Sequence, residues 1–169
     1  MSAPWLPRGI GRIGFVALVL AGGLLVVRGL AGQPPVDPVI GKVFPLAASI
    51  PFRRAAPSRR AGAHMINMFA SWCVPCRAEA SALAALTARG ARIDGIAVRD
   101  EPAAVTQFLA RTGNPFASVW LDPDGKIQRT LGVSGVPETY VVDAGGVIVY
   151  RHRGALEAAD VTTLASYLQ

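Results

Sequence analysis

The sequence predicts an α/β domain with a mixed central sheet flanked by helices, preceded by one N-terminal transmembrane helix. Two observations lead to this prediction. From residue 63 onward, short apolar runs typical of strands alternate with longer alanine- and leucine-rich runs typical of helices. Near the N-terminus, residues 13–27 form an apolar run of fifteen residues without a charge. The length of 169 residues, 51% of them hydrophobic, suits one domain with a short appendage and excludes a disordered chain.

Residues 13–31 are predicted to be a transmembrane signal-anchor that leaves residues 1–12 in the cytoplasm. The apolar run is bounded by Arg12 and Arg28 and is shorter than the usual span of about 20 residues, but terminal arginines can snorkel. The excess of positive charge before the run places the rest of the chain outside the cytoplasm. A cleaved signal peptide is the alternative, and Arg28 directly before the cleavage box at 29–31 argues against it.

Residues 32–61 are predicted to be a linker and the start of the domain, because they hold six prolines and two arginine pairs. Residues 62–169 are predicted to be the domain itself. The net charge of +6 arises before this point, since residues 1–60 hold eight basic residues and one acidic residue. The remaining 109 residues hold nine basic and ten acidic residues without a basic stripe. The charge pattern therefore excludes nucleic-acid binding.

The elements of the domain are expected in the following order. An apolar strand at 64–69 precedes a helix at 75–89, which Gly90 ends. A strand at 93–98 precedes a helix that Pro102 opens and that ends near Thr112. Next come a strand at 119–121, a turn at 122–125, two strands at 140–142 and 147–150 joined by a hairpin turn at 143–146, and a final helix at 158–168.

The chemistry-bearing motif is Cys73–Val74–Pro75–Cys76, which lies between a predicted strand and a predicted helix. Cys73 falls at the helix N-terminus, where unpaired N–H groups and the helix dipole favour a thiolate. Cys76 lies three residues later, within disulfide reach. Such a pair can exchange two electrons with a partner disulfide through a mixed disulfide. No cofactor is needed for that chemistry, and we expect none.

Other roles for the two cysteines fit less well. A structural disulfide closing so short a loop would stabilise the fold by only about 2 kcal/mol. A metal site needs two further ligands, and neither His64 nor His152 has suitable spacing. Covalent haem attachment needs a histidine after the second cysteine, where this chain has Arg77.

The chain resembles a known family at several places. Residues 72–77 (WCVPCR) look like the active site of thioredoxin-fold proteins. Residues 113–116 (GNPF), 132–140 (GVSGVPETY) and 150–154 (YRHRG) are similar to the membrane-anchored thiol–disulfide reductases of cytochrome c maturation, the DsbE/CcmG family. The likeness runs from about Val39 to the C-terminus. The resemblance implies a thioredoxin-like fold.

The resemblance also implies residues that support the cysteine pair. Pro137 would be a cis-proline facing that pair, with the Val136 backbone free to pair with an extended substrate. Glu138 would lie near the active site and tune its protons and potential; a solvated charge at a strand end is the alternative. Trp72 is expected to pack beside the cysteines and shield them.

The acids around the motif are less certain from sequence. The buried acid of general thioredoxins, six residues before the first cysteine, is Asn67 here. Glu79, three residues after Cys76, is the next candidate for relaying the proton of Cys76; an exposed glutamate in the first helical turns is the alternative. Asp100 and Glu101 are expected to be solvated loop residues.

The resemblance implies a function in which Cys73 attacks and Cys76 resolves. The partners would be apocytochrome c, or cytochrome c maturation proteins that handle it, and a membrane electron-carrier protein that re-reduces the chain. Three alternatives stay open: a general extracytoplasmic thioredoxin-like reductase, a dithiol oxidant, and a redox-inert membrane-tethered scaffold. Residue types alone do not give the direction, which depends on the reduction potential.

Overall fold

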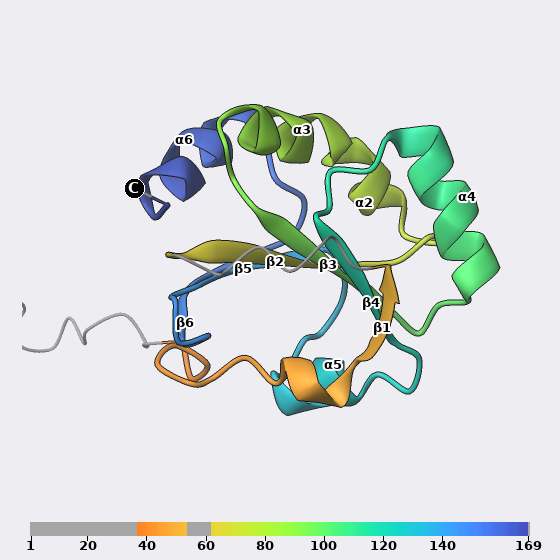
Figure 1. Ribbon diagram of the computed structural model, residues 1–169, viewed down its shortest axis with the longest axis horizontal. Coiled ribbons are helices and arrows are strands. Elements are labelled where there is room, and N and C mark those ends of the chain that lie inside the picture. The colour runs from red at the N-terminus through yellow and green to blue at the C-terminus, as the bar shows by residue number, and fades with distance from the viewer. Residues whose placement is uncertain (1–36, 54–61, 169) are drawn as a thin grey trace, which may run out of the picture. The chain divides into compact units, whose positions relative to one another are not determined.

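Six strands form one mixed sheet in the computed structural model, which describes residues 37–53 and 62–168 (Figure 1). The order across the sheet is β1-β4-β3-β2-β5-β6. Neighbouring strands β2, β3 and β4 are parallel, while β1, β5 and β6 each run antiparallel to the strand beside them. The strand bounds are β1 Ile50–Arg53, β2 His64–Phe69, β3 Ile93–Val98, β4 Ser118–Asp122, β5 Glu138–Val142 and β6 Ile148–Arg153.

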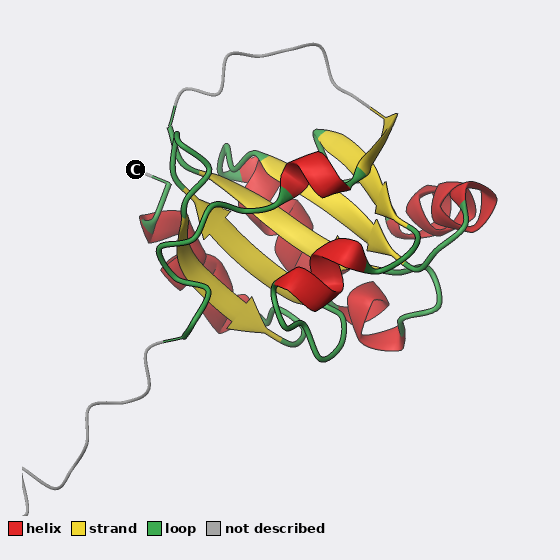
Figure 2. Cartoon of the chain, turned by 90° about the horizontal axis from the view of Figure 1, so that it is seen from below, coloured by secondary structure: helices red, strands yellow, loops and turns green. Residues whose placement is uncertain are grey.

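Helices cover both faces of the sheet. Figure 1 shows α2, α3, α4 and α6 on one face and α5 with the short 3-10 helix η1 on the other. The view from the second face shows α5 and η1 in front of the strands (Figure 2). The helix bounds are η1 Leu46–Ala48, α2 Val74–Ala78, α3 Ala80–Ala88, α4 Pro102–Thr112, α5 Lys126–Thr130 and α6 Ala158–Ser166.

Each face of the sheet has its own hydrophobic cluster. The cluster under α3, α4 and α6 includes Leu86, Phe108 and Leu164, together with both cysteines. The cluster under α5 and η1 includes Ile127 and Tyr140. The central strands β2 and β3 are buried along their whole length, which explains why their sequences are mostly apolar rather than alternating.

The thioredoxin-like α/β fold with a mixed sheet is confirmed, and β2, β3 and α4 have the predicted bounds. The single helix predicted at 75–89 is wrong, because the chain divides at Glu79 into α2 and α3. The backbone ψ of Glu79 is −4°, far from the helical value near −42°, and the side chain turns into the protein interior.

The strand β1, the 3-10 helix η1 and the helix α5 were not predicted. Strand β1 lies in the region expected to be a linker and the start of the domain, and it pairs with β4 at the sheet edge. Helix α5 follows the expected turn at 122–125 and has only five residues, too few for a helical period in the sequence. Its first N–H groups are satisfied by the buried Asp122 carboxylate, which accepts from Lys126 N at 2.7 Å and from Gln128 N at 3.1 Å.

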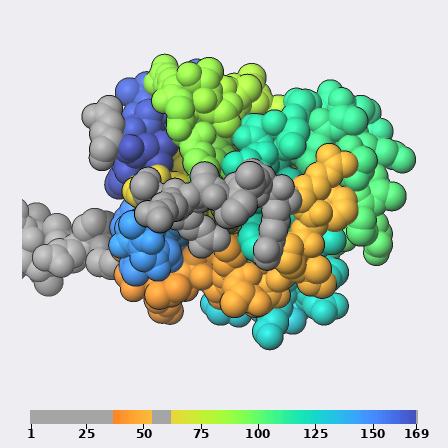
Figure 3. All heavy atoms as spheres, viewed as in Figure 1, coloured from red at the N-terminus to blue at the C-terminus, as the bar shows by residue number. Residues whose placement is uncertain are grey.

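Residues 37–48 pack on the face of the sheet that also carries α5. Val39 and Phe44 are buried there, and the Phe44 ring meets Tyr140 edge-on at 5.3 Å between centroids. In the space-filling view this segment lies against α5 (Figure 3). The predicted cytoplasmic N-terminus and transmembrane helix lie outside the described residues. Among the residues that are described, no helix is long and apolar enough to cross a membrane.

Candidate active site

The two cysteines lie where β2 ends and α2 begins, and they form a disulfide with 5.3 Å between their Cα atoms. Cys73 is the N-cap residue of α2, and its sulfur accepts a hydrogen bond from Cys76 N at 3.1 Å. Pro75 lies in the first turn, where its missing N–H costs no helical bond. A thiolate at Cys73 would therefore receive a backbone N–H, which supports its assignment as the attacking sulfur.

The loop before β5 lies against the first cysteine. The Val136–Pro137 peptide bond is cis, as the resemblance implied. The Val136 carbonyl oxygen is 3.4 Å from Cys73 Sγ, so the backbone of Val136 lies beside the pair. The residues next to Cys73 in the chain, Trp72 and Val74, have exposed side chains, with 59% and 64% of their surface accessible. Trp72 is therefore a surface residue beside the disulfide, and its indole N–H donates to the Arg99 carbonyl at 3.3 Å.

Glu79 is completely buried at the junction of α2 and α3, so the alternative of an exposed glutamate is wrong. Its Oε1 accepts from the Asn67 amide at 3.0 Å, and its Oε2 accepts from Leu156 N at 3.1 Å. Burial raises the pKa of the Glu79 carboxyl to about 7, although the Leu156 and Asn67 hydrogen bonds each act to lower it. A carboxyl with a pKa near 7 can both accept and release a proton at neutral pH.

Cys76 and Glu79 line one small cavity together with Asn67 and Phe116. Its volume is about 10 Å³, close to the space that one water molecule needs. The Asn67 side chain also donates to Thr139 Oγ1 at 3.1 Å, while its Oδ1 is buried and has no hydrogen-bond partner within the described ranges. The second cysteine, the acid and the amide thus line one small cavity.

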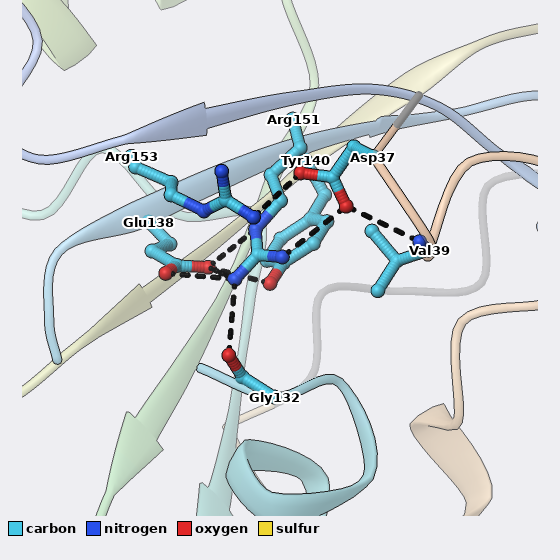
Figure 4. A network of polar contacts seen from close by, with 7 residues as sticks. All are labelled: Asp37, Val39, Gly132, Glu138, Tyr140, Arg151 and Arg153. Carbon is cyan, nitrogen blue, oxygen red and sulfur yellow. Dashed lines mark hydrogen bonds and ion pairs between the residues drawn. The ribbon is translucent and has the colours of Figure 1, made fainter. Parts of the chain in front are cut away.

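Glu138 is also buried, with 2% of its surface exposed, so a solvated strand-end charge is wrong. Figure 4 shows its carboxylate beside the Arg151 guanidinium. Arg151 Nε donates to Oε2 and Nη2 donates to Oε1, both at 2.9 Å, and the Tyr140 hydroxyl donates to Oε2 at 2.6 Å. Because Glu138 and Tyr140 alternate with Thr139 on β5, the Glu138 side chain points to the face of the sheet opposite Asn67 and Glu79. Its contacts are those of a structural anion.

The same network reaches the first described residue of the domain. Asp37 pairs with Arg151 at 3.4 Å and with Arg153 at 2.7 Å (Figure 4). Burial acts to lower the pKa of Arg151, but the neighbouring Tyr140, Glu138 and Asp37 outweigh it and the pKa is raised. Burial and the adjacent Glu138 carboxylate also raise the pKa of the Tyr140 hydroxyl. Arg151 therefore stays charged and Tyr140 stays protonated throughout the physiological range.

Asp100 is not a solvated loop residue, which corrects the expectation from sequence. It is buried at 7% exposure, and its carboxylate accepts hydrogen bonds from the backbone and side chain of Ser71. Glu101, by contrast, is exposed as expected. The signal for Asp100 was its position two residues after the end of β3, which is parallel to β2, because the carboxyl ends of parallel neighbours meet at one edge of the sheet.

The two histidines lie away from the cysteines. His64 is buried at the start of β2, with Nε2 at 3.9 Å from Asp94, and His152 lies on β6 at 3.7 Å from Asp160. No cluster of three metal-ligating side chains occurs within residues 37–53 and 62–168. Arg151 is the main site residue that sequence reasoning did not single out, although its motif carried part of the resemblance. It lies opposite Tyr140 only because the register shifts between Val141 and Val142, so counting outward from the hairpin turn would not have placed it there.

The fold and the cysteine pair define a thioredoxin-fold protein with a Cys-x-x-Cys disulfide at the start of α2. Residues 56–168 match the Redoxin family. The chain is 41% identical over 122 residues to the thiol:disulfide interchange protein HelX of Rhodobacter capsulatus, covering 72% of this chain and 68% of that protein. It is 39% identical over 104 residues to a thiol:disulfide interchange protein DsbE homolog of Paracoccus denitrificans, covering 62% of this chain.

A solution structure of a thiol:disulfide interchange protein from Bacteroides sp. has the same fold, with a TM-score of 0.60 and 17% identity over 79% of this chain and 92% of that one. The chain belongs to the Redoxin family and, within it, to the DsbE/CcmG family of thiol:disulfide interchange proteins. The matched stretch spans 58% of the length of the Paracoccus protein and 50% of the Escherichia coli DsbE.

Proposed function

We propose that this chain is an extracytoplasmic thiol–disulfide oxidoreductase that reduces a disulfide of apocytochrome c, or of a protein that handles it, before haem attachment. The observation that carries the proposal is the setting of the Cys73–Cys76 disulfide. Cys73 lies against the Val136 carbonyl, and Cys76 lines the same cavity as Glu79. Membership of the DsbE/CcmG family supports the cytochrome c client. Haem attachment needs both client cysteines as thiols, so an oxidising compartment requires a dedicated reductant.

In the proposed reaction, the Cys73 thiolate attacks one sulfur of the client disulfide. A mixed disulfide forms, and the other client sulfur leaves as a thiolate. The Cys76 thiol then loses its proton and attacks Cys73 Sγ, which releases the second client thiol and leaves the Cys73–Cys76 disulfide. Two electrons pass from the chain to the client, and the two client sulfurs end as thiols.

Glu79 is the proposed acceptor of the Cys76 proton. The cavity that Cys76, Glu79 and Asn67 line has a volume of about 10 Å³, close to what one water molecule needs, and a water there would connect the sulfur and the carboxylate. The pKa near 7 suits this role because the group can take a proton at neutral pH and return it to solvent later. Glu138, paired with Arg151, instead holds the strand that follows Pro137.

The proposed setting is the periplasmic side of the cytoplasmic membrane. Residues 13–31 would anchor the chain, and a membrane electron-carrier protein would re-reduce the Cys73–Cys76 disulfide by a second exchange of the same kind. This part of the proposal rests on the apolar run and its flanking arginines, and on the implied family role. No cofactor takes part, because both electrons come from the two thiols.

Trapping tests the client. A Cys76→Ser variant keeps the attacking sulfur but cannot resolve the mixed disulfide, so its covalent partners accumulate and can be identified after non-reducing electrophoresis. We expect apocytochrome c or its handling proteins in these adducts, and none with the Cys73→Ser control.

Other results would overturn the specific proposal. Adducts spread over many secreted proteins would indicate a general reductase. Normal cytochrome c assembly with Cys73→Ser would indicate a scaffold. A reduction potential well above about −180 mV would indicate an oxidant.

A further inference from the structure

The loop between β3 and α4 holds the two residues that precede the attacking cysteine. The Asp100 carboxylate accepts the Ser71 N–H through Oδ2 and the Ser71 hydroxyl through Oδ1, the latter at 2.8 Å. The Glu101 N–H donates to the same Oδ1 at 2.8 Å. The carboxylate is thus bound by three donors, and two of them belong to a residue only two positions before Cys73.

The next residue, Trp72, is held from the same loop. Its indole N–H donates to the carbonyl of Arg99, which is the one residue other than glycine with a positive φ (47°) within residues 37–53 and 62–168. This left-handed backbone conformation is unfavourable for a residue with a Cβ, and contacts with the turn at 122–125 stabilise it. Arg99 N donates to the Asp122 carbonyl at 2.9 Å, and the guanidinium lies where a side chain on Gly125 would be.

We propose that Asp100 is a positioning residue for disulfide exchange, which holds Ser71 and so keeps Cys73 Sγ at the Cys76 N–H when the disulfide is open. The inference rests on the proposed function. In the oxidised chain the covalent S–S bond itself keeps the two cysteines together. In the reduced chain that restraint is gone, and Cys73 depends on the turn from Ala70 to Cys73, where Cys73 N donates to the Ala70 carbonyl at 3.2 Å.

The consequence is a difference between the two redox states. Loss of the Asp100 contacts costs the reduced chain more than the oxidised one, because only the reduced chain needs them to place the thiolate at a hydrogen-bond donor. The equilibrium constant for exchange with glutathione measures that difference directly. A purely structural role would destabilise both states equally and leave the constant unchanged.

The loss of the negative charge alone predicts a shift of the exchange equilibrium in the opposite direction, toward the dithiol. Removing a carboxylate near Cys73 favours the thiolate and therefore the reduced state. Glu101 provides the matched control, because it is the adjacent carboxylate, is exposed, and makes no side-chain hydrogen bond at the start of α4. Glu101→Gln removes the same charge without removing a contact to the Ser71 turn.

The test is the glutathione exchange equilibrium of the full chain, measured by alkylation and mass separation. We expect Asp100→Asn to shift the equilibrium toward the disulfide by about fivefold or more. Ser71→Ala, which loses the hydroxyl contact and keeps the backbone one, should shift it about twofold the same way. Glu101→Gln should leave it unchanged or move it slightly toward the dithiol.

Equal shifts with Asp100→Asn and Glu101→Gln would overturn the proposal in favour of charge. An unchanged equilibrium with Asp100→Asn, accompanied by a lower melting temperature in both redox states, would overturn it in favour of a structural role. If Asp100→Asn does not fold, an unchanged equilibrium with Ser71→Ala overturns it as well. A wild-type chain that does not exchange with glutathione at all would instead contradict the proposed function.

Discussion

The Glu138 carboxylate receives two hydrogen bonds of 2.9 Å from the Arg151 guanidinium, on adjacent strands of the sheet. Both side chains are buried, and Glu138 is the first residue after the cis Val136–Pro137 bond. The pair therefore links the loop at Val136–Pro137, which contacts Cys73, to the edge strand β6. A buried pair of this kind is costly to break from one side, because the remaining charge is left without a partner.

Replacing Arg151 by methionine is expected to lower the free energy of unfolding by about 3–5 kcal/mol, measured by urea unfolding of the oxidised chain. The matched control is Arg153→Met. Arg153 also pairs with Asp37, but 58% of its side chain is exposed, so the loss should be below about 1 kcal/mol. Combining Arg151→Met with Glu138→Gln should recover much of the loss. Equal, small effects of both arginine variants would contradict a buried role for the pair.

The raised pKa of Glu79 makes stability depend on pH. In the unfolded chain this carboxyl ionises near its ordinary value of 4.5, whereas in the folded chain it keeps its proton up to about 7. The folded state binds more protons in this range, so the free energy of unfolding should fall as pH rises from 4.5 to 7, by about 3 kcal/mol in all, and level off above that. Glu79→Gln should remove this decline in urea unfolding at several pH values. A decline of the same size in the variant would assign it to other groups.

Asn67→Asp tests the Glu79 site by placing a second carboxyl next to it. The Asn67 amide lies 3.0 Å from Glu79 Oε1, so the substitution puts two carboxyls in contact in a buried place. Two such groups cannot both ionise at an ordinary pH, and one of them should keep its proton above pH 7. We expect the decline in stability to extend to higher pH than in the wild-type chain. The double variant with Glu79→Gln, which holds one acid, should lose that extension. If the decline in Asn67→Asp ended at the same pH as in the wild-type chain, the close contact between residues 67 and 79 would be contradicted.

Gly95 allows the close packing of an aromatic ring above the sheet. A Cβ on Gly95 would lie 2.8 Å from the Phe116 ring, which stacks on Phe69 at 4.8 Å between centroids. Gly95→Ala should therefore cost about 1–3 kcal/mol of stability, measured as the shift in the urea midpoint. Gly135→Ala is the control, since nothing lies within 4 Å of a Cβ there and its φ is not positive. Equal midpoints for the two variants would show that the ring can move aside.

The chain's local patterns were sufficient to predict the strand before the cysteines and the start of the helix after them. Mostly apolar runs indicated β2 and β3, the Cys-x-x-Cys pair indicated the strand–helix junction, and proline and glycine indicated the limits of α4. These features depend on neighbours within a few residues of one another, so they are readable along the sequence. The break at Glu79 and the short helix α5 were missed, because both depend on hydrogen bonds of buried carboxylates rather than on periodicity.

The burial of the acids was decided only by the tertiary structure. Glu79 meets a backbone N–H at Leu156, 77 positions away, and Asp100 meets Ser71, 29 positions away. The sequence near an acidic residue does not show whether its carboxylate will be exposed or buried, because distant segments of the chain decide what packs around it. The sequence by itself determined which sulfur atoms can react and at which junction they lie. Only packing decided which carboxyl holds a proton beneath them and which ones hold the loops in place.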